Sequence, residues 1–190
     1  MTRPEVVVLF AWAVVGGDNL WRAWRARRRT SERGVVRLTA GGLVLVGLAV
    51  ASQQMERMAD RWTASPVLVI VGMLSALLGA AVHLHARHTL GNQWATSIRP
   101  TATDAPVTDG LYGRVRHPLY AAIRLLSVGL VCVHPSPATF CLTAGLMAGT
   151  GIKARAEERA LTAAFPELYP PYAARTPRFC PHHAPGPKPT

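Results

Sequence analysis

The sequence has few charged residues, and acidic residues are especially scarce. Only 16% of its 190 residues are charged, with 10 Asp or Glu against 21 Lys or Arg, while 49% are hydrophobic. The hydrophobic residues form blocks separated by arginine-rich stretches. A soluble bundle of such blocks would have too little polar surface to cover them. The composition therefore favours an integral membrane protein.

The sequence also lacks a recognisable framework of disulfides or metal ligands. The three cysteines, Cys132, Cys141 and Cys180, have no paired spacing. Three histidines precede residue 90: His83, His85 and His88. Only the last two lie close to one helix face, and no carboxylate is near them in sequence. They more simply line the polar end of a helix, so no metal site is predicted.

Five apolar blocks predict an all-α fold, an integral membrane bundle of about five transmembrane helices. The blocks are Val6–Leu20, Leu38–Ser52, Ala64–Ala86, Leu119–Val133 and Pro137–Ile152. Only the third exceeds the roughly 18 to 20 residues of a clear span, so the others must recruit flanking residues. The first block follows a poor basic leader and precedes no small-residue cleavage site. It is therefore predicted to be a retained anchor.

Positive charge alternates between the connections of these blocks. Seven arginines lie between residues 22 and 37, four between 87 and 116, and six Lys or Arg follow residue 152. The bias of positive charge toward the cytoplasm predicts an external N-terminus and a cytoplasmic C-terminus. The net charge of +11 is then explained by topology and by attraction to anionic membrane lipids. Nucleic-acid binding is not expected, because no binding fold supports it.

The segment from Gly110 to Tyr120 is the strongest candidate for chemistry. It reads Gly-Leu-Tyr-Gly-Arg-Val-Arg-His-Pro-Leu-Tyr and combines a turn with basic and aromatic side chains. Pro118 suits the first position of a helix. Free N–H groups at that helix start, beside Arg116 and His117, would favour an anionic ligand. The alternative is a basic turn that only marks a cytoplasmic helix end.

A second polar cluster follows the fifth block. It begins at Lys153, contains Glu157 and Glu158, and ends at Phe165. Considered alone, it reads as a solvated helix with weak ion pairs. Two cytoplasmic loops and this helix must nevertheless converge beneath one small bundle, which would bring the glutamates to His117. Opposed charges in a pocket at the membrane surface suit a zwitterionic ligand.

Three blocks in order resemble the isoprenylcysteine carboxyl methyltransferase family and, more loosely, the phospholipid N-methyltransferases. Residues 90–94, Leu-Gly-Asn-Gln-Trp, are similar to the family's Leu-Gly-x-x-Trp segment. Residues 110–120 are similar to its Gly-x-Tyr-x-x-x-Arg-His-Pro-x-Tyr motif. Residues 157–181 resemble its ending from Glu-Glu-x-x-Leu to Arg-Phe-x-Pro. The resemblance covers roughly residues 85 to 181.

The resemblance implies a membrane enzyme that uses S-adenosylmethionine in a pocket on the cytoplasmic side. Its cofactor-binding residues would be Tyr112, Arg116, His117, Pro118, Leu119, Tyr120, Glu157 and Glu158. Residues beside the acceptor and the reacting groups would be Trp94, Arg124 and Lys153. A carboxylate acceptor is ionised near neutral pH, so alignment and exclusion of water would suffice without a catalytic base.

Arg124 stands out because it lies one or two turns inside an apolar block. An arginine at that depth costs about 2.5 kcal/mol or more unless it finds a partner or reaches the interface. Spacing places it on one helix face with His117 and Tyr120. Three roles stay open: pairing with an anionic substrate or cofactor group, pairing with an internal structural partner, and snorkelling toward headgroups.

The chain departs from the family pattern at two positions. Pro166 replaces a usual glycine and must change the exit from the preceding helix, and Lys153 stands where arginine is common. The chain also lacks the Gly-x-Gly element of phospholipid N-methyltransferases, which favours a carboxylate acceptor.

We expect one methyltransferase domain over residues 1–181, a disordered tail at 182–190, and a lipophilic small-molecule or lipidated acceptor that arrives from the bilayer. Alternatives are an amine or phospholipid N-methyltransferase and a non-catalytic membrane protein of the same fold.

Overall fold

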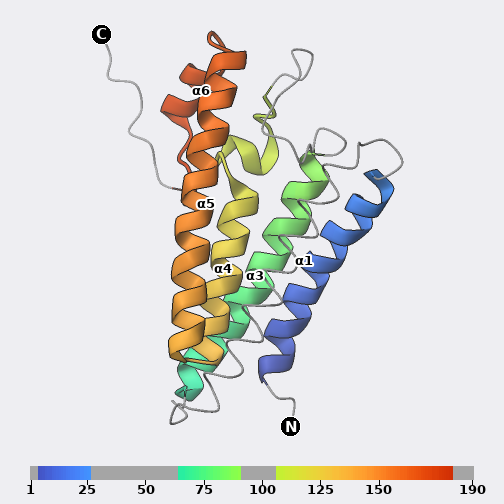
Figure 1. Cartoon of the computed structure of the whole chain (residues 1–190), viewed down its shortest axis with the longest axis vertical. Coiled ribbons are helices and arrows are strands. Elements are labelled where there is room, and N and C mark those ends of the chain that lie inside the picture. Colours follow the sequence, from blue (N-terminus) through green and yellow to red (C-terminus); the bar gives the residue numbers. More distant parts are fainter. Residues whose placement is uncertain (1–3, 27–63, 91–105, 182–190) are drawn as a thin grey trace. The chain divides into compact units, whose positions relative to one another are not determined.

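The computed structural model describes residues 4–26, 64–90 and 106–181, and most of them are helical (Figure 1). The elements in chain order are α1 (Pro4–Ala26), α3 (Pro66–Leu90), the 3-10 helix η2 (Gly110–Gly113), α4 (Pro118–Val133), α5 (Pro137–Ala164) and α6 (Tyr169–Arg175). These three ranges contain no strand, which confirms the expected all-helical class for them. The predicted second span, Trp94 and the predicted disordered tail lie outside the described residues.

Prolines and small polar residues set the helix boundaries. The helices α1, α3, α4 and α5 each begin at a proline, whose missing N–H costs nothing at that position. Ser136 caps α5, since its hydroxyl accepts the backbone N–H of Thr139 at 3.2 Å. At the other end, α5 stops at Ala164 because the residue before Pro166 is disfavoured in helical conformation.

Helix α5 is longer than the sequence pattern indicated. The sequence predicts an apolar block to Ile152 and a separate charged segment from Lys153, but these form one 28-residue helix. The physical reason is that Lys, Arg, Glu and Ala at the junction are all good helix formers, and no proline interrupts them. The glutamates therefore belong to the same helix as the fifth apolar block.

One described helix is long and apolar enough to cross a membrane. This is α3, with 25 residues and a mean hydropathy of 2.4 in its most apolar window. Its large apolar side chains are strongly exposed, including Val67 at 68% and Leu74 at 62%, as expected of a helix that faces lipid. Helices α1, α4 and α5 coincide with three more predicted apolar blocks. A bundle of five spans stays a prediction.

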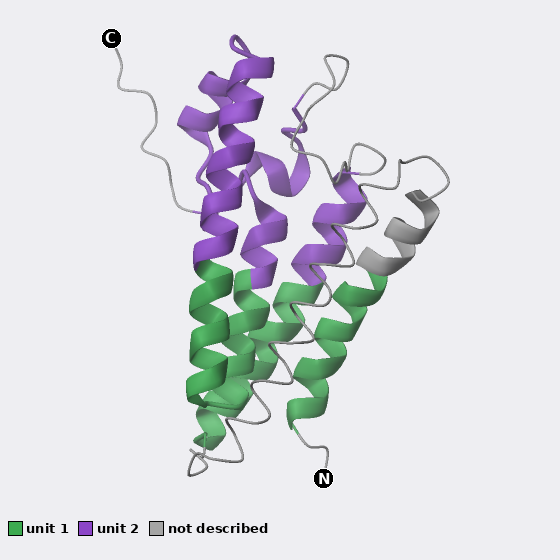
Figure 2. Cartoon of the chain, viewed as in Figure 1, with its two compact units in different colours: residues 1–80, 124–147 green, residues 81–123, 148–190 purple. Residues whose placement is uncertain are grey.

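The chain divides into two compact units, coloured separately in Figure 2. Unit 1 comprises residues 1–80 and 124–147, and unit 2 comprises residues 81–123 and 148–190. The divisions fall within α3, α4 and α5, so each of these helices contributes residues to both units. The two units are described in turn.

Unit 1 is held together by a small apolar core and by close approach of two helices. The core comprises Val8, Ala11, Val15, Ala76, Ala80, Leu126 and Val133. A Cβ atom built on Gly129 would lie 2.7 Å from the carbonyl oxygen of Gly72 and 3.0 Å from the Cβ of Ala76. Only glycine permits this separation, which resembles the small-residue packing of membrane helices.

Unit 2 contains the turn that leads into α4. Gly110 has a φ of +60°, a conformation that glycine adopts without strain, and η2 follows directly. The hydroxyl of Tyr172 in α6 donates to the carbonyl oxygen of Tyr112 in η2 at 2.6 Å. Both tyrosines are buried. This bond fixes η2, and with it the chain entering the Arg-His-Pro turn, against α6.

Candidate functional site

Three segments of unit 2 meet around the side chain of His117. The first is the turn at the start of α4, the second is the charged part of α5, and the third is the chain after α6. His117 Nε2 lies 3.0 Å from Oε1 of Glu158, and its Nδ1 lies 3.7 Å from Oε2 of Glu157. The imidazole, only 7% exposed, is thus placed between the two adjacent glutamates.

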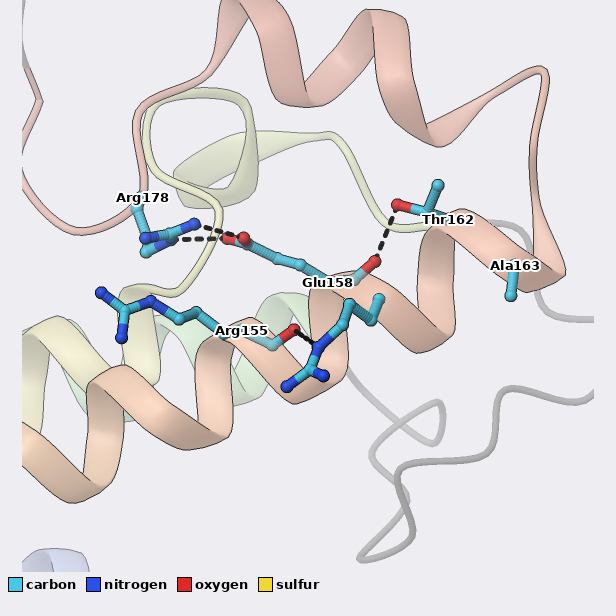
Figure 3. Close-up of a pocket in the computed structure, with 6 residues that line it drawn as sticks. Arg155, Glu158, Thr162, Ala163 and Arg178 are labelled. Atoms are coloured by element: carbon cyan, nitrogen blue, oxygen red, sulfur yellow. Dashed lines mark hydrogen bonds and ion pairs between the residues drawn. The ribbon is translucent and has the colours of Figure 1, made fainter.

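Glu158 is fully engaged by basic side chains. Arg178 donates from Nε and Nη2 to its two oxygens at 2.8 and 2.6 Å (Figure 3). Arg116 Nη1 lies 3.4 Å from the oxygen that also contacts His117. Burial alone would raise the pKa of Glu158, but the Arg178 hydrogen bonds and the charge of Arg116 together lower it below its usual range. Glu158 is therefore an ionised anchor for its neighbours.

Glu157 has a different environment. Its Oε1 accepts a hydrogen bond of 2.5 Å from the Tyr120 hydroxyl, and its side chain is 29% exposed. Burial raises the pKa of Glu157, and the Tyr120 hydrogen bond and the charge of Lys153 only partly offset this. Lys153 Nζ also lies 5.6 Å from the centre of the Tyr120 ring. Glu157 thus keeps acceptor capacity that Glu158 does not.

The protonation of His117 follows from the same geometry. Burial is the largest influence and lowers the pKa of His117 below its ordinary value, although Glu158 raises it. A neutral imidazole that donates from Nε2 to Glu158 has only a lone pair on Nδ1. That lone pair cannot satisfy the carboxylate of Glu157. Glu157 Oε2 therefore has no donor from His117, and its side chain is partly exposed.

A short segment after α6 clamps the Arg-His-Pro turn. The backbone N–H groups of Arg116 and His117 donate to the carbonyl oxygens of Pro177 and Arg178, at 2.8 and 3.1 Å. The ring of Phe179 lies 6.0 Å from the imidazole. These two N–H groups are consequently not available to an anion. The N–H groups at the start of α4, which were predicted to be free for an anion, are also engaged in part. Those of Tyr120 and Ala121 donate to the carbonyl oxygen of His117, at 3.1 and 3.0 Å.

The other predicted cofactor-binding residues also lie in unit 2. Tyr112 is buried, and burial raises its pKa. Pro118 is fully buried and Leu119 half-buried at the start of α4. The Tyr120 ring stacks on His117 with 5.5 Å between centroids. The structure thus brings all eight predicted cofactor-binding positions into one unit, and their roles stay predictions.

The residues predicted beside the acceptor are distributed differently. Lys153 is in unit 2, near Glu157 and Tyr120. Arg124 belongs to unit 1, where its Nη2 donates to the carbonyl oxygen of Met147 at 3.0 Å. This bond gives the guanidinium a neutral partner within an apolar stretch.

Arg178 is absent from the residues assigned a role by sequence reasoning. Its signal was present in the Arg-Phe-x-Pro ending, but the sequence does not reveal which side chain the arginine meets. The sequence analysis considers His83, His85 and His88 and predicts no metal site. In the described part of the chain, no group of three or more His, Cys, Asp or Glu could hold a metal. The three cysteines are free.

Comparison with known proteins finds similarity to two proteins that are named for metal resistance. Over 129 residues the chain is 37% identical to the cobalt-zinc-cadmium resistance protein CzcN of Cupriavidus metallidurans, covering 64% of the chain and 54% of that protein. Over 143 residues it is 34% identical to the nickel-cobalt-cadmium resistance protein NccN of Alcaligenes xylosoxydans xylosoxydans, covering 73% of the chain and 60% of that protein. The chain thus spans little more than half the length of these relatives. No solved structure matches it.

The family comparison bears on the site directly. The matched region runs from residue 70 to residue 163 and includes His117 and both glutamates. It ends before Arg178, which the contacts alone connect to the site. Through residues 70–163, the chain belongs to the isoprenylcysteine carboxyl methyltransferase family.

Proposed function

We propose that the chain is an S-adenosylmethionine-dependent membrane methyltransferase that methylates a carboxylate on a lipophilic acceptor. The observation that carries this proposal is the contact of His117 with Glu157 and Glu158 inside the family-matched region. The three side chains come from sites about 40 residues apart in sequence. They form a cluster of acceptors with the cations Arg116, Lys153 and Arg178 nearby, in which Glu157 is 29% exposed.

The side chains present fit the chemistry of this cofactor. The donor carries an ammonium and ribose hydroxyls that need acceptors, and a carboxylate that needs a cation. Glu157 would accept from the ammonium or a ribose hydroxyl, since it is partly exposed and His117 does not satisfy it. Glu158 would act indirectly by holding His117 and Arg116 in place. This assigns the two glutamates different tasks, which the sequence left open.

The cofactor supplies an activated methyl group, so the chain need only bind, orient and exclude water. A carboxylate acceptor is already ionised near neutral pH and needs no general base. His117 is accordingly a positioning residue in this proposal. Lys153 lies beside Glu157 and would attract the acceptor's negative group. The role of Arg124 in unit 1 stays a separate prediction, tested by Arg124→Met with the donor saturating: loss of methyl transfer at unchanged stability would indicate a role in acceptor binding.

The first experiment is an incubation of membranes containing the chain with radiolabelled S-adenosylmethionine, followed by identification of the product. We expect a lipophilic product whose methyl group is released by mild base, as an ester requires. A base-stable product would instead indicate an amine or phospholipid N-methyltransferase. No product, and no thermal stabilisation by S-adenosylhomocysteine, would identify a non-catalytic membrane protein.

The topology is part of the same proposal. The arginine-rich connections support a cytoplasmic C-terminus and an external N-terminus, and the donor must be supplied from the cytosol. Reporters fused after Thr190 and before Met1 should be cytoplasmic and external, respectively. A C-terminus found outside would contradict the assignment, because residue 178 and the glutamates would then face the wrong compartment.

The names of the two relatives suggest a physiological setting. Both are described as proteins of resistance to cobalt and cadmium, with zinc or nickel. We propose that methylation by this chain contributes to tolerance of these metals. A strain lacking the gene should regain cadmium tolerance from the wild-type chain and not from Glu157→Gln. Equal rescue by both would separate metal tolerance from methyl transfer.

A further inference from the structure

A basic pocket lies along α5, next to the candidate cofactor site. Its volume is about 610 Å³, and its lining residues are Arg155, Glu158, Arg159, Thr162, Ala163 and Arg178. Figure 3 shows the Arg155 side chain extending toward the same side of the pocket as Arg178. All six residues belong to unit 2. The pocket contains three guanidinium groups and one carboxylate.

The charges of this basic pocket do not balance. Glu158 is already engaged by Arg178 through two hydrogen bonds. Arg159 donates from Nε to a neutral acceptor, the backbone oxygen of Arg155, at 3.3 Å. Neither Arg155 nor Arg159 meets a carboxylate among the residues that the structure describes. Two positive side chains therefore share one concave, solvent-accessible surface.

Position along α5 indicates which anion would be found there. The apolar part of the helix ends at Ile152, which is 64% exposed. At 1.5 Å per residue, Arg155 lies about 4.5 Å and Arg159 about 10 Å further along the axis. The polar headgroup layer begins where the hydrocarbon ends and is about 5 to 7 Å thick on each side. With the apolar part of α5 in the membrane, both guanidiniums fall at or just beyond the phosphates.

The polar group opposite the arginines has a defined role as well. Thr162 donates its hydroxyl hydrogen to the backbone oxygen of Glu158 at 2.8 Å. Its oxygen can then only accept from a ligand. Two guanidiniums that suit a phosphate and an acceptor that suits a hydroxyl match a phosphodiester headgroup bearing hydroxyls.

We propose that this basic pocket binds the headgroup of an anionic phospholipid. Binding of the lipid involves no methyl transfer and requires no donor. The proposal rests on the placement of the apolar part of α5 in the membrane. Glu158 and Arg178 line the pocket and also hold His117, so the bound lipid would lie directly against the candidate cofactor site.

The test uses the full chain purified in an uncharged detergent, without donor. Thermal unfolding is measured while phosphatidylglycerol or phosphatidylcholine is added at equal mole fractions. We expect phosphatidylglycerol to raise the melting temperature by several degrees more than phosphatidylcholine does. Combined Arg155→Gln and Arg159→Gln substitution should weaken the apparent phosphatidylglycerol affinity at least tenfold. The paired Lys variant, which keeps both charges, should retain most of the response.

The matched control is Arg175→Gln. Arg175 is also exposed and also donates from Nε to a backbone oxygen, that of Pro171, but it lies outside the pocket. It should respond to phosphatidylglycerol like the wild type. Equal shifts from both lipids, or an unchanged response in the paired Gln variant, would overturn the proposal. An equal shift from inorganic phosphate at the same concentration would overturn it too, because the anion would then not be a lipid.

Discussion

Arg178 grips the carboxylate of Glu158 with two hydrogen bonds, while its own backbone oxygen accepts the N–H of His117. One residue therefore fixes both the histidine and the glutamate that the histidine contacts. The planar guanidinium matches the two carboxylate oxygens, a geometry that lysine cannot reproduce. The consequence is that Arg178 should position His117 and Glu158 without itself touching the cofactor.

Replacing Arg178 tests this positioning role. Arg178→Gln should lower stability by about 1 kcal/mol, less than is usual for charge-assisted bonds because the side chain is about one-third exposed and solvent screens the pair. It should also weaken S-adenosylhomocysteine binding about fivefold. Arg178→Lys should keep the charge yet recover little of the binding. Thermal unfolding measures the stability of each variant, and calorimetric titration in detergent measures its affinity for S-adenosylhomocysteine. Unchanged affinity in the two variants would show that Arg178 supports only the fold.

The buried His117 predicts a pH dependence of stability. Its folded-state pKa lies below the ordinary 6.5, so the folded chain binds fewer protons there than the unfolded chain. Its contribution is present above about pH 6.5 and is lost as pH falls toward the folded-state pKa. The raised pKa of Glu157 has the opposite effect on stability. Its contribution is fully present below about pH 4.5 and is lost as pH rises through the folded-state pKa.

A variant of His117 separates its pH-dependent contribution to stability from that of Glu157. The melting temperature of the wild type is measured between pH 5 and 7 beside that of His117→Gln, which keeps a donor for Glu158. The variant should lose less stability on acidification than the wild type. Parallel curves would mean that His117 does not titrate differently in the folded chain.

Tyr120→Phe tests the role of Glu157. The substitution removes the 2.5 Å hydrogen bond to Glu157 but keeps the ring beside His117 and Lys153. Because that bond lowers the pKa of Glu157, its loss should move the acid limb of S-adenosylhomocysteine binding to higher pH. Tyr172→Phe loses a hydroxyl bond elsewhere in unit 2 and should leave the midpoint unchanged. If the pH midpoint of the acid limb does not move in Tyr120→Phe, Glu157 does not take part in ligand binding.

Two glycines of unit 1 give a matched pair for helix packing. Gly129→Ala would place a Cβ 2.7 Å from the Gly72 oxygen, so the helices must separate at a cost of about 2 kcal/mol. Gly145 in α5 has no atom within 4 Å of such a Cβ. Gly145→Ala should leave stability equal or slightly higher, since alanine favours helix. Thermal unfolding in detergent compares them, and equal melting temperatures would contradict the close packing.

Local patterns were sufficient for much of the fold. Proline at the first helical position predicted the start of α4, and Pro166 predicted an altered exit from α5. The junction at Ile152 was not predicted, because a change from apolar to charged residues marks a change of solvent and leaves helix propensity intact. Periodicity describes which residues share a face, and it carries no information on where a membrane ends within one helix.

The site was only partly accessible to such reasoning. The sequence placed His117 near the glutamates, since a small bundle leaves few places for three cytoplasmic segments. It could not assign different tasks to Glu157 and Glu158, which are neighbours with identical side chains. That difference depends on what surrounds each carboxyl. The hydrogen bonds of Arg178 and the charge of Arg116 lower the pKa of Glu158, whereas burial raises the pKa of Glu157 by more than the Tyr120 hydrogen bond lowers it.

The backbone clamp between the Arg-His-Pro turn and Pro177–Arg178 also orders events during synthesis. His117 and Arg178 are 61 residues apart, and at about 5 to 20 residues per second the ribosome needs roughly 3 to 12 s between them. For that interval the N–H groups of Arg116 and His117 lack their final acceptors and Glu158 lacks its guanidinium. The proposed cofactor site can therefore form only after the helices that carry it have been made, so we expect a nascent chain stalled before residue 177 to lack that site.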